Sequence, residues 1–218
     1  MTTDDLIQQL GRDLRPVRRL LPSWQRAAVW LACGVVYVVA VAIVGWFRRG
    51  GLGVESTAPY VLQQGALAFT ACLAALTAFA SVVPGMRSRA IAALSIPLAA
   101  IMLALLWGAW RDLEQLGTFG LGRETDWPCV LSITLGGTAL WGVASAMLRR
   151  GAVLEPRTTS LLAAVAALSL ANIEACVSQV HAFTATVIVW HGATAASLML
   201  AVIMVGPWVL VRRPSDVR

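Results

Sequence analysis

The sequence predicts an all-α membrane protein, a polytopic bundle of six transmembrane helices. Hydrophobic residues make up 58% of the 218-residue chain and charged residues only 13%, whereas soluble domains carry roughly 25% charged residues. The hydrophobic residues gather in six stretches of roughly 20 residues, the length that a helix needs to cross ~30 Å of hydrocarbon. These stretches far exceed the ~10-residue alternating strands of an outer-membrane barrel, so we expect helices.

Arginine, tryptophan or proline marks at least one boundary of each of the first three stretches. Ala27–Phe47 is followed by Arg48 and has a tryptophan as its second-last residue. Pro59–Val83 begins at a proline, and Ala90–Trp110 stops in front of Arg111. Tryptophan and arginine both favour the membrane interface. Each of the three stretches is therefore expected to cross the membrane once.

The last three stretches have similar boundaries. Trp127–Leu148 opens on a tryptophan and stops at a pair of arginines, Thr159–Cys176 follows Arg157, and Phe183–Val211 stops at another arginine pair. The predicted domains are therefore a polar N-terminal segment over residues 1–26, a transmembrane domain over 27–211 and a short tail over 212–218. The N-terminal segment holds three acidic residues and five arginines, which is unlike the apolar stretch of a cleaved secretory signal.

The distribution of arginines predicts the orientation. All 17 basic residues are arginine, and six crossings place thirteen of them on the side of the two termini. The four on the opposite side are Arg48, Arg49, Arg111 and Arg123. Positive residues stay cytoplasmic, so both termini are expected in the cytoplasm. The net charge of +6 is then mostly a topology signal and an attraction to anionic lipid, and we expect no direct nucleic-acid binding.

The N-terminal segment resembles a short amphipathic helix. Asp4 and Asp5 lie where acids favour a helix start, and leucines and an isoleucine then recur at spacings of three and four until Pro16. Two interpretations remain open. The helix lies on the inner leaflet, or it docks into a groove of a partner protein.

The four cysteines divide into two pairs. Cys33 and Cys72 lie within apolar spans, where cysteine behaves as a small hydrophobe, and we expect them to serve packing. Cys129 opens the fourth span and Cys176 closes the fifth, which places both at the outer face, in an oxidising compartment if the membrane is an inner membrane. We expect them to lie near each other, as two inert thiols, a structural disulfide or a sensor.

Two further polar residues lie inside predicted spans. Glu174 is two residues from Cys176, so we expect a solvated helix end and not a proton relay. His191 lies deeper, in the last span. It is expected either to hydrogen-bond a neighbouring helix or to line a small outer cavity with Glu174 and His181.

Several short motifs together resemble one protein family. They are Thr3-Asp4-Asp5-Leu6-Ile7, Pro16-Val17-Arg18-Arg19-Leu20, Trp107-Gly108-Ala109-Trp110-Arg111-Asp112, Trp127-Pro128-Cys129, Leu148-Arg149-Arg150-Gly151-Ala152 and Val189-Trp190-His191. In this order and on this topology, the chain resembles the NrsF family of integral-membrane anti-sigma factors from end to end. The resemblance implies a protein that holds an extracytoplasmic-function sigma factor at the bacterial inner membrane and releases it on an envelope, metal or oxidative signal.

The resemblance also implies site residues. The expected contacts with the sigma factor are Asp4, Asp5, Leu6, Asp13, Arg15, Arg18 and Arg19, the leucine for affinity and the charges for specificity. The expected sensing residues are Cys129 and Cys176. Thiolates favour soft metal ions, and His181 is near enough in sequence to join them. The residues after Cys176 are Val177, Ser178 and Gln179, where the resemblance leads us to expect acids.

Other functions are less well supported by the sequence. A small transporter or channel is the main alternative, although the chain shows no inverted repeat and no midplane charges in unwound spans. A membrane thiol oxidoreductase would need a reactive Cys-x-x-Cys pair, which the chain lacks. No phosphate loop or nucleophile with a positioned base is present. We therefore expect no enzymatic activity and no cofactor, with the lipid bilayer and a sigma factor as partners and no prediction of the oligomeric state.

Overall fold

The computed structural model describes residues 21–49, 51, 54, 56–81, 92–117, 127–151, 153–178 and 184–211. The described elements are helices, six of which are long and apolar enough to cross a membrane. They are α2 (Ser23–Arg49), α3 (Ala58–Ala80), α5 (Ser95–Leu116), α6 (Trp127–Leu148), α7 (Pro156–Ser178), and a last helix made of α8 (Thr184–Thr186), a π-helical turn (Val187–His191) and α9 (Gly192–Leu210). The predicted fold class is confirmed.

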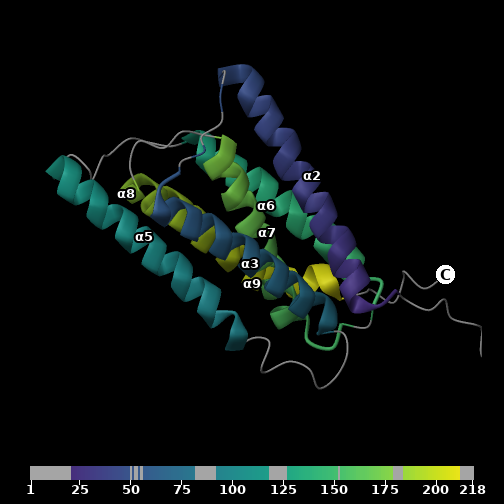
Figure 1. The fold of residues 1–218 in the computed structure, drawn as a ribbon. Coiled ribbons are helices and arrows are strands. Elements are labelled where there is room, and N and C mark those ends of the chain that lie inside the picture. The colour runs from purple at the N-terminus through teal and green to yellow at the C-terminus, as the bar shows by residue number, and fades with distance from the viewer. Residues whose placement is uncertain are drawn as a thin grey trace, which may run out of the picture.

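The helices alternate in direction, so that the start of α2 and the end of α9 lie at the same end of the bundle (Figure 1). We call this the terminal end. The opposite end, where α6 begins and α7 finishes, is called the thiol end because Cys129 and Cys176 lie there. Which end faces the cytoplasm stays a prediction from the arginines. Residues 1–20 and 212–218, and with them most of the predicted N-terminal segment and the predicted tail, lie outside the described residues.

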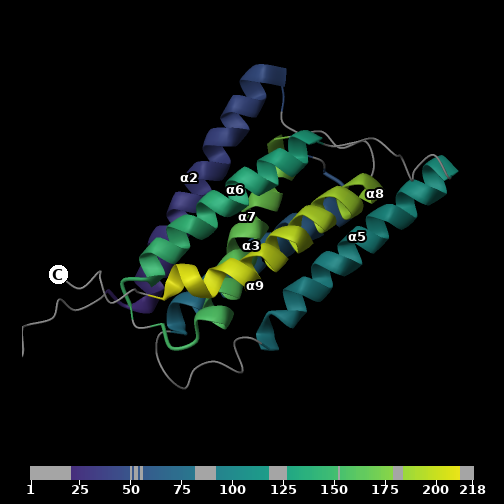
Figure 2. The same ribbon diagram turned by 180° about the vertical axis from the view of Figure 1, so that it is seen from behind.

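Helix α7 forms the centre of the bundle and contacts α2, α3, α6 and α9. Within its most apolar stretch 72% of the residues are buried, against 17% in α2. The sequence of α7 explains this position, since most of its buried side chains are alanine or serine, and small residues allow helix backbones to approach closely in a membrane. Figure 2 shows α7 enclosed by its neighbours while α5 lies at the periphery.

Helix α2 is attached to the bundle by few polar contacts. Near the terminal end, the buried Arg26 guanidinium donates to the carbonyl of Phe79 at 3.3 Å and lies 5.5 Å from the centre of that ring. One turn further along, the indole Nε1 of Trp30 donates to the carbonyl of Leu140 at 3.1 Å. The last turns of α2 project past α6 and α7 in both views (Figures 1 and 2). The first half of α2 therefore packs more firmly against the rest of the bundle than its second half does.

Cys33 and Cys72 do not serve packing, contrary to the expectation from the sequence. Both side chains are exposed on the outer surface of their helices. An apolar span alone does not reveal which face of a helix is buried, because lipid is as apolar as a protein core. In a bilayer these two thiols face hydrocarbon.

Candidate functional site

The candidate site lies at the thiol end, where α6, α7 and the π-helical turn meet. Ser132 of α6 lies 2.5 Å from Glu174 of α7, and a Cβ added to Gly137 would come within 2.9 Å of the Leu168 side chain. The two helices are antiparallel neighbours, so each step toward the start of α6 matches one toward the end of α7. This register places Cys129 and Cys176 at the same level of adjacent helices.

Both of these cysteines are buried thiols. Cys129 is 0% exposed and Cys176 is 3% exposed, and neither forms a disulfide in this structure. Their burial distinguishes them from Cys33 and Cys72, which are exposed. A reagent that modifies either thiol must therefore reach a side chain that its neighbours cover, and a larger group placed there has to displace those neighbours.

A buried carboxylate lies on α7 two residues before Cys176. Glu174 is 1% exposed and accepts three hydroxyl hydrogen bonds, from Ser132 of α6 at 2.5 Å, Ser178 of α7 at 2.9 Å and Tyr37 of α2 at 3.4 Å. The expectation of a solvated helix end is wrong. Because an acid buried in a span needs partners, three helices each contribute one hydroxyl, and Glu174 connects them.

The tyrosine reaches this carboxylate only because α6 carries a glycine at the crossing point. A Cβ added to Gly136 would overlap the Tyr37 hydroxyl and lie 2.8 Å from its Cζ atom. Gly142, further along the same helix, has open space around its Cα instead. Gly136 therefore leaves room for the hydrogen bond from Tyr37 to Glu174. Among the described residues, this is the only polar contact between the second half of α2 and α7.

On the other side of α7, the side-chain amide of Asn172 and the imidazole of His191 join α7 to the last helix. His191 Nδ1 lies 3.1 Å from the side-chain oxygen of Asn172, which confirms the first of the two expectations for this histidine. His191 belongs to a π-helical turn, a feature often found at functional sites. In the preceding position, the ring of Trp190 lies 5.8 Å from the ring of Trp127, which opens α6.

The structure describes only part of the predicted metal site. Among the residues it covers, no three His, Cys, Asp or Glu side chains lie close enough together to hold a metal ion. Cys129 and Cys176 are among those residues, whereas His181 lies outside them.

The predicted docking residues Asp4, Asp5, Leu6, Asp13, Arg15, Arg18 and Arg19 also lie outside the described residues. They stay predictions. What the structure provides is the helix that follows them, since α2 begins at Ser23.

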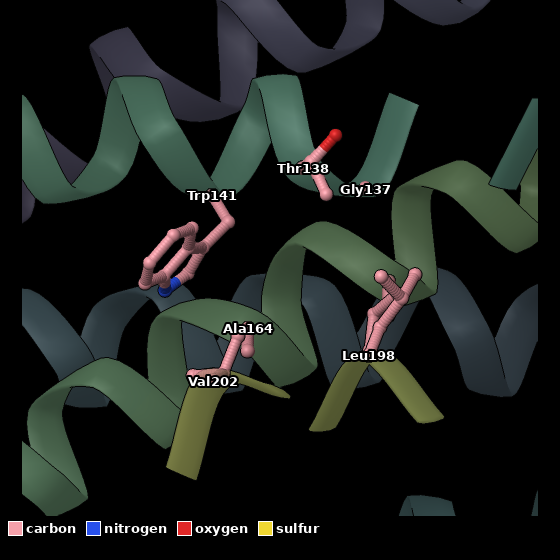
Figure 3. Close-up of a pocket in the computed structure, with 7 residues that line it drawn as sticks. Gly137, Thr138, Trp141, Ala164, Leu198 and Val202 are labelled. Atoms are coloured by element: carbon pink, nitrogen blue, oxygen red, sulfur yellow. The ribbon is translucent and has the colours of Figure 1, made fainter. Parts of the chain in front are cut away.

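Pockets between the described helices border this part of the bundle, and two of them involve α6 and α7. One is a crevice of about 20 Å³ between α6, α7 and α9, and Figure 3 shows Trp141 of α6 directed toward Ala164 and Val202 across it. Its size is that of about one water molecule, so we regard it as a packing gap. The other pocket, of about 260 Å³, lies between α2, α6 and α7 beside Glu174.

The comparison with protein families decides the class of this protein. The model of the NrsF family, described as negative regulator of sigma F, matches residues 10–211. The chain belongs to this family. Membership in the NrsF family makes the protein a negative regulator of a sigma factor, and a sigma factor is therefore its partner. No curated protein and no solved structure gives a significant match.

Sequence reasoning identified the family and singled out Cys129 and Cys176 without predicting their burial, and it missed the connections around Glu174. The missing signal was Tyr37, a single phenol in an otherwise apolar span, together with Gly136 in the span opposite. A lone tyrosine in a span needs a hydrogen-bond partner. That argument would have directed attention to an acid in a neighbouring helix.

Proposed function

We propose that this protein is a membrane-bound anti-sigma factor that holds an extracytoplasmic-function sigma factor at the bacterial inner membrane. The family match over residues 10–211 carries the proposal, and six apolar helices agree with a multi-pass protein. With both termini in the cytoplasm, residues 1–26 form the docking segment, aided by short cytoplasmic loops rich in arginine. Their positive charge favours rapid capture of an acidic partner.

The sigma factor is held through the N-terminal amphipathic segment. A stable interface buries ~1,200 Å² or more, and the leucines of residues 1–20 supply its apolar part. Asp4, Asp5 and Asp13 with Arg15, Arg18 and Arg19 set the register. Helix α2 begins at Ser23, three residues after the end of the segment 1–20. The position of α2 therefore determines where this segment is presented to the sigma factor.

The signal enters at Cys129 and Cys176. Oxidation of the two thiols to a disulfide, with two electrons and two protons passing to an external oxidant, or capture of a soft metal ion between them would change the packing of α6 against α7. Cys176 is two residues from Glu174, which accepts a hydrogen bond from Tyr37. A shift at the thiols therefore weakens the attachment of α2 and alters the presentation of the docking segment. Such a switch requires a difference of a few kcal/mol between two packings.

Deletion of residues 2–20 tests the docking assignment. We expect the shortened protein to insert into the membrane as before, because all six spans remain, and to lose co-purification of the sigma factor. Deletion of residues 212–218 is the matched control and should leave co-purification intact. If the protein lacking residues 2–20 still brings down the sigma factor at the normal level, the docking segment lies elsewhere.

A further inference from the structure

The 260 Å³ pocket beside Glu174 has features that the proposed regulation does not use. It is lined by α2, α6 and α7, and its lining includes one acidic and one basic side chain, Glu174 and Arg48. The partners of Glu174 among the described residues are three neutral hydroxyls. Hydroxyls stabilise a buried carboxylate but do not neutralise it. Among the described residues, the hydrogen-bond partners of this carboxylate are therefore neutral, and Arg48 lines the same pocket without forming one of these hydrogen bonds.

The two charges lie at opposite levels of the pocket. Glu174 is one helical turn before Ser178, the last residue of α7 and also part of the lining, so the Cα of Glu174 lies about 6 Å below that of Ser178. Arg48 belongs to the last turn of α2, and Pro128 to the first turn of α6. The pocket thus has an acidic floor and a basic rim at the thiol end of the bundle.

The rest of the lining is partly apolar. It comprises Val41, Val44 and Gly45 of α2 and Pro128 of α6, together with the serines Ser132 and Ser178. The volume is slightly below the ~300 to 1,000 Å³ of pockets that hold drug-sized ligands. A fitting occupant is a small molecule with a cationic group at one end, a short methylene chain, and an anionic group at the other end.

We propose that this pocket binds a small zwitterion, an ammonium group joined to a phosphate or carboxylate through a short methylene chain. The ammonium lies at the floor against Glu174 and the hydroxyls around it, and the anionic group lies at the rim against Arg48. Phosphoethanolamine has this chemistry, and it occurs both as a free solute and as the headgroup of a phospholipid. The inference concerns ligand binding alone and does not rest on the sigma-factor assignment.

The test uses the full-length purified protein, freed of lipid in detergent. O-phosphoethanolamine is titrated by calorimetry, with ethanolamine and inorganic phosphate as probes for each charge alone. Native mass spectrometry of the protein from nanodiscs that contain phosphatidylethanolamine or phosphatidylglycerol tests the lipid source. We expect binding of the zwitterion at least tenfold tighter than of either fragment, or selective retention of phosphatidylethanolamine. The first result identifies a solute ligand and the second a lipid ligand.

Variants locate the binding to this pocket. Glu174→Gln keeps the shape but removes the charge and should weaken binding at least tenfold, and Arg48→Gln should weaken it severalfold. Val44→Trp fills the pocket without altering the carboxylate, so it remains informative if Glu174→Gln fails to fold. Arg111→Gln, an arginine of α5 that does not line the pocket, is the matched control. Absence of binding of either source, or binding that Val44→Trp and Glu174→Gln leave unchanged, overturns the proposal.

Discussion

The contact between Gly136 and Tyr37 allows a quantitative prediction for Gly136→Ala. The new Cβ would overlap the tyrosine hydroxyl and lie 2.8 Å from Cζ, so the ring must leave its position. Overpacking of this kind costs about 1 to 3 kcal/mol. The lost hydrogen bond to Glu174 adds about 0.6 kcal/mol, the average for such bonds in membrane proteins. The total expected destabilisation is roughly 1.5 to 3.5 kcal/mol.

The assay is reversible unfolding of the purified protein by SDS in mixed micelles, followed by tryptophan fluorescence. Gly142→Ala on the same helix is the matched control, because a Cβ there meets open space. It should be neutral or stabilise by up to about 1 kcal/mol through helix propensity. Equal stability of the two alanine variants would show that the close approach of Tyr37 to α6 does not exist.

A double-mutant cycle separates this clash from a general effect of glycine replacement. In the Tyr37→Ala background the ring is absent, so Gly136→Ala should cost little. The expected coupling energy is about 1 to 3 kcal/mol, which lies within the range of about 0.5 to 3 kcal/mol found for residues in contact. A coupling near zero would mean that Gly136→Ala acts through some other contact, and the proposed link between α2 and α7 would lose its support.

Three further predictions concern other contacts. Trp30→Phe removes the donor to the Leu140 carbonyl and should destabilise the protein by about 1 kcal/mol in the same SDS assay; no change would mean that this bond does not hold α2. Asp112 accepts from the backbone N–H of Thr184 at 2.7 Å, so Asp112→Ala should speed hydrogen exchange at the start of the last helix, while Glu114→Ala should not. The double variant Cys129→Ser and Cys176→Ser should abolish the release of the sigma factor on thiol oxidation or cadmium exposure, measured with a sigma-dependent reporter. The exposed pair Cys33→Ser and Cys72→Ser should respond normally, and the reverse pattern would exclude the buried pair as the sensor.

Hydropathy located all six spans but not all of their ends. The predicted third span stopped at Trp110, whereas α5 continues to Leu116. The extra turn is polar, and it is held by a Trp110 hydrogen bond to Glu114 and by Asp112 at the start of the last helix. Helical hydrogen bonding does not stop where apolar residues stop, so hydropathy underestimates a helix whose end is stabilised by polar contacts.

The positions of individual side chains around each helix were harder to predict. The apolar spans of Cys33 and Cys129 look alike in sequence, yet one thiol is exposed and the other is buried. The difference arises from which helices are neighbours, and in lipid an apolar face gives no signal of its own. Glu174 was recognised as unusual, but one of its hydrogen bonds comes from Tyr37, which is 137 positions away in the sequence. Contacts of this range are set by the packing of the bundle.

The most direct test of the proposed function is purification of the tagged protein from its native membrane in mild detergent, followed by mass spectrometry of the proteins that accompany it. We predict that a sigma factor of the extracytoplasmic-function class accompanies the unstressed protein in near-stoichiometric amount and is lost after treatment with a thiol oxidant. Recovery of the protein without any sigma factor, from cells in which that sigma factor is expressed and inactive, would contradict the proposal.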